Sequence, residues 1–122
     1  MFIGGIQAVT INALSNTAQI LCPIEDIPKS GESIVRVHVR LRATGATHSV
    51  AIKVWSVAAS GTATLLDTLD TLDCASSAVV QKCYEVPNEG NVFFLVPTLA
   101  VTIETAGLTD SVEVTANVYI EG

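Results

Sequence analysis

The sequence of 122 residues has few of the side chains on which most catalytic and metal sites depend. It contains two histidines, three cysteines, and six lysines and arginines together. It has no Cys-x-x-Cys pair, phosphate-binding loop, dinucleotide fingerprint or Gly-x-Ser-x-Gly motif. We therefore expect no enzymatic activity, no metal site and no cofactor.

Long apolar runs are also missing. The longest, Val92–Val96 followed by Pro97, is far shorter than the roughly 20 residues that cross a bilayer. The N-terminus, Met1-Phe-Ile-Gly-Gly-Ile, lacks the basic start and the apolar run of a secretory signal. These absences predict a soluble protein that is made in the cytoplasm and has no membrane partner.

The cysteines Cys22, Cys74 and Cys83 are odd in number and are not spaced as metal ligands. We expect them to be buried thiols that act as small hydrophobic side chains. A Cys74–Cys83 disulfide stays open as an alternative, although it would need an oxidising compartment.

Basic residues are scarce, and the net charge of −6 is unevenly distributed. Residues 1–61 carry five Lys and Arg against three Asp and Glu, whereas residues 62–122 carry one against nine. An acidic chain with few aromatic residues argues against a nucleic-acid partner. Beyond solubility, the asymmetry suits a molecule with one positive and one negative surface, which could dock against copies of itself or a charged partner.

What the chain does have is short alternating runs rich in Val, Ile and Thr, a pattern typical of β-strands. The predicted strands are 6–14, 17–22, 33–42, 47–57, 78–86, 91–96, 99–105 and 111–121. In residues 65–74, Leu-Asp-Thr recurs with a period of three. There we predict a strand to about Asp67 and then a short helical turn or irregular segment.

Eight or nine strands at roughly ten-residue spacing predict an all-β fold. We expect one antiparallel β-sandwich domain over residues 1–122, jelly-roll or immunoglobulin-like, with residues 1–5 as an N-terminal arm.

The most regular alternation lies in residues 33–42, where Val35, Val37 and Val39 share one face of the strand. A hairpin with residues 47–57 would pair them with Val54, Ile52 and Val50, so the hydrophobic pattern favours this register.

In that hairpin, a like-charged surface with a tryptophan forms the outer face. Arg36 would face Lys53, and Trp55 would face Ile34. Because Trp and Arg dominate interface energies, we predict a contact surface there, unless another part of the chain covers Trp55. Its residues are Arg36, His38, Arg40, Arg42, Lys53 and Trp55.

The chain resembles small structural proteins of tailed-bacteriophage virions, especially capsid decoration (cement) proteins. The shared features are a short all-β chain rich in Ala, Val and Thr, Gly4-Gly5 in a possible arm, and the ending Leu108-Thr-Asp-Ser-Val-Glu-Val-Thr-Ala-Asn-Val-Tyr-Ile. The resemblance implies a virion protein without catalysis. Its partners would be the major capsid protein, at subunit junctions, and copies of itself as a homo-oligomer.

Two other functions stay open. One is a free β-sandwich binding module, for example for glycans held by Trp55 with Tyr84 or Tyr119. The other is a different virion component, such as a tail or head-tail protein.

Overall fold

The computed structural model describes residues 2–12, 15–23, 34–43, 48–74, 79–87, 98–105 and 111–121. This part of the chain forms eight strands, and all the pairings between them are antiparallel. The strands are β1 (Phe2–Ile11), β2 (Thr17–Pro23), β3 (Ile34–Ala43), β4 (His48–Val57), β5 (Ala63–Cys74), β6 (Val79–Pro87), β7 (Thr98–Thr105) and β8 (Val112–Glu121).

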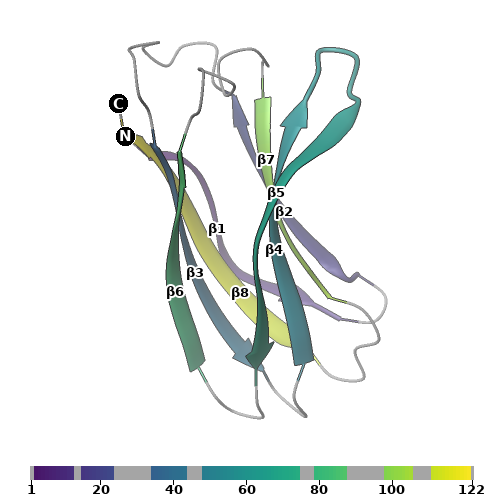
Figure 1. Ribbon diagram of the computed structural model, residues 1–122. Helices are drawn as coiled ribbons and strands as arrows, with labels where there is room; N and C mark the ends of the chain where they lie inside the picture. Colours follow the sequence, from purple (N-terminus) through teal and green to yellow (C-terminus); the bar gives the residue numbers. More distant parts are fainter. Residues whose placement is uncertain are drawn as a thin grey trace.

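The strands form two four-stranded sheets that pack face to face (Figure 1). The first sheet has the order β1-β8-β3-β6 and the second has the order β2-β7-β4-β5. Aliphatic side chains from both sheets fill the space between them, and the largest that are fully buried include Leu41, Ile52 and Ile103. The predicted all-β sandwich of about eight strands is confirmed. No helix of the described part is long and apolar enough to cross a membrane.

A nearly constant register relates four of the strand pairs. The numbers of paired residues add to 121 in β2–β7, as in 17 with 104, and in β3–β6, as in 34 with 87. In β1–β8 and β4–β5 they add to between 120 and 123. The chain is therefore one long antiparallel hairpin with its tip between β4 and β5, rolled up into two sheets. This strand arrangement is that of a jelly roll, one of the two topologies left open by the sequence.

The predicted hairpin between residues 33–42 and 47–57 is wrong. β3 pairs with β6 and β8, whereas β4 pairs with β5 and β7, so the two strands lie in opposite sheets. Their apolar faces were assigned correctly, because Val37 and Ile52 are both fully buried in one core. Alternation specifies which face of a strand is buried, but packing across a sandwich satisfies it as well as pairing within a sheet does.

Strand β5 continues to Cys74, so the helical turn predicted after Asp67 is also wrong. Its pairing with β4 has two register shifts, which leave Leu66 and Leu69 as extra residues in β5. Each such β-bulge shifts the alternation by one residue. Leu66, Leu69 and Leu72 consequently all pack against the core although they are three residues apart.

Residues 2–5 belong to strand β1 and pair with β8, instead of forming the arm that we expected. A Cβ atom at Gly4 would lie 2.8 Å from Ile20 Cγ2 in the second sheet, and one at Gly5 would lie 2.6 Å from Asn117 Oδ1. The two glycines thus allow neighbouring strands to approach closely.

The remaining strands agree with the predictions at β2, β6, β7 and β8, while the strand predicted at 91–96 falls outside the described residues. Cys22 and Cys74 are buried, as expected of thiols that act as hydrophobic side chains, and burial raises the pKa of Cys22 to about 11. The same expectation is wrong for Cys83, which is exposed because it lies on the outer face of β6, and no disulfide joins it to Cys74.

One polar contact bridges the two sheets at the side where β5 and β6 are the edge strands. The Tyr84 hydroxyl of β6 donates a hydrogen bond of 3.0 Å to Asp70 Oδ2 of β5. Partial burial, together with the neighbouring carboxylate, raises the pKa of Tyr84. Because only the neutral phenol can donate this bond, the contact is made below the pKa of the hydroxyl.

Substituting alanine for Gly4 should destabilise the fold by about 1–3 kcal/mol, because the new methyl group would overlap Ile20. Urea denaturation followed by tryptophan fluorescence would measure the change. Gln19→Ala, at an exposed position of β2, is the control and should stay within about 0.5 kcal/mol of the wild type. Equal stability of Gly4→Ala and the wild type would contradict this packing.

Tyr84→Phe should cost about 1 kcal/mol near neutral pH, because Asp70 loses its donor. The raised pKa of Tyr84 favours the folded protein below the ordinary tyrosine value of about 10, and that contribution is lost as the pH rises above it. The difference in unfolding free energy between wild type and Tyr84→Phe should therefore shrink in alkaline solution. A difference that stays constant between about pH 8 and pH 11 would contradict the bridge.

Candidate docking surfaces

The six residues predicted to form one contact surface lie on two opposite outer faces of the sandwich. Because β3 belongs to the first sheet, Arg36, His38, Arg40 and Arg42 lie on its outer face. Because β4 belongs to the second sheet, Lys53 and Trp55 lie on the other outer face. The structure does not bring these two groups together.

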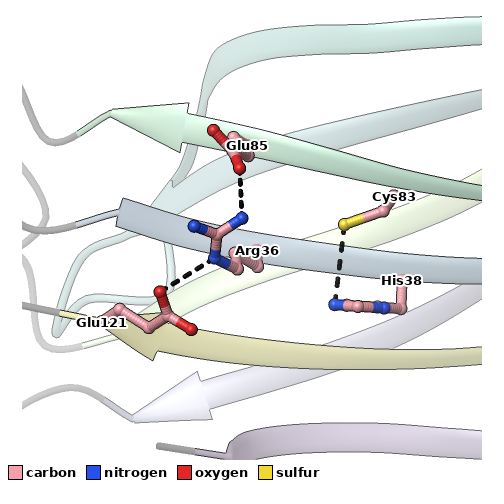
Figure 2. Close-up of polar contacts among 5 residues, drawn as sticks. All are labelled: Arg36, His38, Cys83, Glu85 and Glu121. Atoms are coloured by element: carbon pink, nitrogen blue, oxygen red, sulfur yellow. Dashed lines mark hydrogen bonds and ion pairs between the residues drawn. The ribbon is translucent and has the colours of Figure 1, made fainter.

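Arg36 is occupied by carboxylates of its own chain (Figure 2). Its Nε donates a hydrogen bond of 2.9 Å to Glu121 Oε2, and Nη1 contacts Glu85 Oε1. Glu121 and then Glu85 raise the pKa of the guanidinium. The acidic second half of the sequence thus supplies the partners of Arg36 from strands β8 and β6, which flank β3.

Lys53 and Trp55 also have partners within the chain, both on strand β7. Lys53 forms an ion pair with Glu104, and the Trp55 indole N–H donates a hydrogen bond of 2.8 Å to Thr102 Oγ1. The Lys53 ammonium lies 6.0 Å from the centre of the indole ring, at the outer limit of a cation–π contact. Trp55 is half-buried, so β7 covers part of the side chain while the rest faces solvent.

An apolar row crosses the outer face of the second sheet, with Trp55 at its centre. Trp55 is opposite Ala100 of β7 on one side and Leu65 of β5 on the other, and Leu21 of β2 is opposite Ala100. Leu21 is 56% exposed and Leu65 is 44% exposed, whereas Ala100 is buried.

The neighbouring row of the same face extends this surface through Val57, which is opposite Ala63 of the edge strand β5 on one side and Thr98 of β7 on the other. Pro23 of the edge strand β2 lies beyond Thr98. We call the two rows together the apolar patch. Its members that reach the surface are the exposed Leu21, Pro23, Ala63 and Leu65 and the half-buried Trp55 and Val57. Towards the other end, the face becomes polar with Gln19, Thr102 and Lys53. One end of this face is therefore apolar and the other is hydrophilic.

The outer face of the first sheet is different, because polar side chains cover its central strands. His38 of β3 lies directly between Asn117 of β8 and Cys83 of β6, and Cys83 Sγ is 3.6 Å from His38 Nε2 (Figure 2). The Tyr119 ring makes edge contacts with His38 on one side, at 5.2 Å, and with Phe2 on the other, at 5.7 Å between ring centres.

Two adjoining hollows lie on this face. The first, of about 420 Å³, is bounded by β3, β6 and β8. Its side chains with polar groups on the outer face are His38, Arg40, Gln81, Cys83, Thr115 and Asn117. The second, of about 390 Å³, lies between β1 and β8 and shares Thr115 and Asn117 with the first. We call the two hollows together the cationic groove, because the Arg40 guanidinium contributes to its lining and no carboxylate does. Lys82 also borders the first hollow, but it is paired with the buried Val39, so its side chain leaves β6 on the opposite face.

The sequence did not point to Leu21, Leu65, Cys83 or Asn117 as parts of a surface. Leu21 carried a usable signal, because it is out of phase with the buried residues Ala18, Ile20 and Cys22 of its strand. To recognise that Leu21, Trp55 and Leu65 lie on one surface, the order of the strands in the sheet must be known, and alternation does not specify it.

The described residues contain no cluster of three or more His, Cys, Asp or Glu side chains that could hold a metal ion. The exposed Cys83 and His38 are two such groups, and two glutamates of the same face, Glu85 and Glu121, are ion-paired with Arg36. The chemistry that these faces offer is hydrogen bonding, charge and apolar contact.

The sequence matches no family model and no curated protein. Solved structures are similar in fold. A chain of the infectious bursal disease virus particle has a TM-score of 0.62 and 11% identity over 98% of this chain, which spans 30% of the viral chain. The CBM22-1 xylan-binding domain from Paenibacillus barcinonensis has a TM-score of 0.59 and 10% identity, over 93% of this chain and 69% of that domain.

A non-crystalline-cellulose-specific carbohydrate-binding module, CBM28, also has a TM-score of 0.59, with 11% identity over 97% of this chain and 73% of that module. At these identities the likeness shows a shared β-sandwich fold. Because one fold supports many functions, the function has to be argued from the surfaces.

The reactivity of the three cysteine thiols tests which of them are buried and which is exposed. In the native protein one thiol per chain, Cys83, should react rapidly with Ellman's reagent, whereas Cys22 and Cys74 should react only after denaturation, because they are buried. Cys83→Ser should abolish the rapid phase and leave the other two thiols unchanged. Rapid reaction of two or three thiols in the folded protein would contradict the assignment.

Proposed function

We propose that the chain is a non-enzymatic structural protein of a virus particle, which binds the capsid shell at subunit junctions and stabilises it as a decoration protein. The observation that carries the proposal is the apolar patch, where a half-buried tryptophan lies between two leucines that are about half exposed. Its partners would be the major capsid protein and further copies of this chain.

The composition of the patch suits a protein contact. Contiguous exposed apolar surface is costly for a free monomer and marks interaction sites in soluble proteins. Tryptophan is the residue that most often dominates interface energy, especially when polar residues surround the apolar centre. Here Trp55 is held in one orientation by its hydrogen bond to Thr102, so little side-chain freedom remains to be lost on binding.

The edges of the sheets support assembly as well. All the large apolar side chains that the described part exposes lie on edge strands: Phe2, Val9, Leu21, Leu65 and Val79. Edge strands have unpaired backbone groups that can pair with a neighbouring chain. On a repetitive shell many such contacts act together, so each of them can be weak. The jelly-roll fold, shared with a chain of a viral particle, adds support by analogy.

The predicted basic surface contributes less than we expected from the sequence. Arg36 and Lys53 are neutralised within the chain, and the exposed residues Arg40 and Arg42 lie on the face opposite the apolar patch. Substituting Arg36 would therefore disturb the pairing with Glu85 and Glu121 rather than test docking.

A double substitution, Leu21→Glu with Leu65→Glu, should weaken binding to capsid shells by about tenfold or more, because it places charge in the apolar contact. Co-sedimentation with particles assembled from the major capsid protein of the same genome would measure the binding. Gln19→Glu adds a charge two residues from Leu21 on the same face, and should leave binding within about threefold of the wild type.

Circular dichroism should show the same fold for all three proteins. Binding that survives in the double variant would contradict docking through the apolar patch. A wild-type chain that is monomeric by light scattering and does not co-sediment with shells would favour a free binding module instead.

A further inference from the structure

We infer that the cationic groove binds an acidic saccharide, independently of the docking proposed for the opposite face. The groove crosses the outer face of the first sheet from β6 over β3 and β8 to β1. Three strand spacings separate β6 from β1, so the groove extends over about 14 Å. This is room for several sugar rings in a row.

Its charge is unusual for this protein. The net charge is −6, yet the side chains that line the groove include the Arg40 guanidinium and no carboxylate. Two other cations are paired within the chain, Arg36 with two glutamates and Lys53 with one. Arg40 has no hydrogen bond or ion pair within the described residues, so its planar group of donors is available to an anionic ligand.

Most of the other lining groups are neutral hydrogen-bonding side chains. Gln81 and Asn117 offer amides that both donate and accept, which matches the dual character of sugar hydroxyls. The Thr115 oxygen accepts a hydrogen bond of 3.0 Å from the Ala8 backbone N–H, so its own proton can be donated to a ligand. Phe2, whose ring is packed against Tyr119, lines the second hollow and adds aromatic surface on which the apolar face of a sugar ring can lie.

The left-handed backbone of Ala8, with φ of 52°, helps to fix this arrangement. It lies at a bulge of β1, where the register with β8 shifts between Ile6 and Val9. This conformation is strained for a residue other than glycine, and such strain concentrates at functional sites. Here it aims the N–H of Ala8 at Thr115, which lines both hollows.

The same geometry disfavours an acidic peptide. An extended peptide gains most of its affinity by adding a strand to an open sheet edge. This groove runs across the strands, and its centre lies on β3 and β8, whose backbone groups are paired on both sides. A ligand there has to be held by side chains, and one arginine among several neutral donors and acceptors suits a sugar with few charges.

The test uses the intact chain with three galactose-based oligomers of equal length: an oligogalacturonate, a sulfated galactan and a neutral galactan. Calorimetry at about 0.15 M salt, where weak surface attraction is screened, measures the affinity. The rate of Cys83 alkylation by iodoacetamide reports occupancy, because Cys83 lines the groove and is the exposed thiol. We expect an acidic oligomer to bind and to slow alkylation, and the two acidic arms distinguish carboxylate from sulfate.

Arg40→Gln should weaken that binding by about tenfold or more. Arg42→Gln is the matched control, because Arg42 is exposed on the same strand face but does not line the groove, and it should change binding by less than about threefold. The Leu21→Glu, Leu65→Glu variant should bind the saccharide like the wild type, so that failure of docking and failure of this inference are distinguishable.

Several outcomes would overturn the inference. They are equal affinity for the neutral oligomer, equal or tighter binding of a polyglutamate peptide, an equal loss in Arg42→Gln and Arg40→Gln, and no protection of Cys83 by either acidic oligomer.

Discussion

The pairing of the chain with itself at a nearly constant register is the constraint on which the rest of the structure depends. In β1–β8, β2–β7, β3–β6 and β4–β5 the numbers of partner residues add to about 121, so the tip lies near Gly61. Only β4 and β5 are partners that also follow each other in the chain. Every other pairing brings together strands that are far apart in the chain. Closing such long loops costs conformational entropy before stabilising contacts form, so this topology is expected to fold slowly.

The same register places the charges. Each of those four pairs joins a strand of the weakly basic first half to a strand of the strongly acidic second half. Arg36 meets Glu85 across one of these pairs, β3–β6. Its second partner, Glu121, and the partner of Lys53, Glu104, lie across β3–β8 and β4–β7, which also join the two halves. The charge asymmetry along the sequence suggested two separate surfaces of opposite sign. In the fold, basic residues of the first half largely lie beside acidic residues of the second. What this leaves is one stretch of β3, around Arg40, where no carboxylate lines the hollow.

Alternation was enough to predict which residues are buried. Val35, Val37, Val50, Ile52, Val112 and Val114 all lie in the core, since a strand with one apolar face has one way to bury it. Alternation does not say which strand lies beside which, because β3 against β4 satisfies it across the sandwich as well as within a sheet. The contact surface predicted around Trp55 and Arg36 depended on that choice, and was therefore divided between two faces. The bulges at Leu66 and Leu69 were hidden for a related reason, because each moves the phase of the strand by one residue.

The jelly roll separates two kinds of recognition. Side chains that point inward are committed to a tightly packed core. Those that point outward are free of packing constraints, and the two sheets face opposite ways (Figure 1). One outer face carries the apolar patch around Trp55 and the other carries the cationic groove around Arg40. Because the core lies between them and they share no contacts, substitutions on the two faces should act additively. A protein attached to a shell through the second sheet would still present the first sheet, and with it the groove, to the surrounding solution.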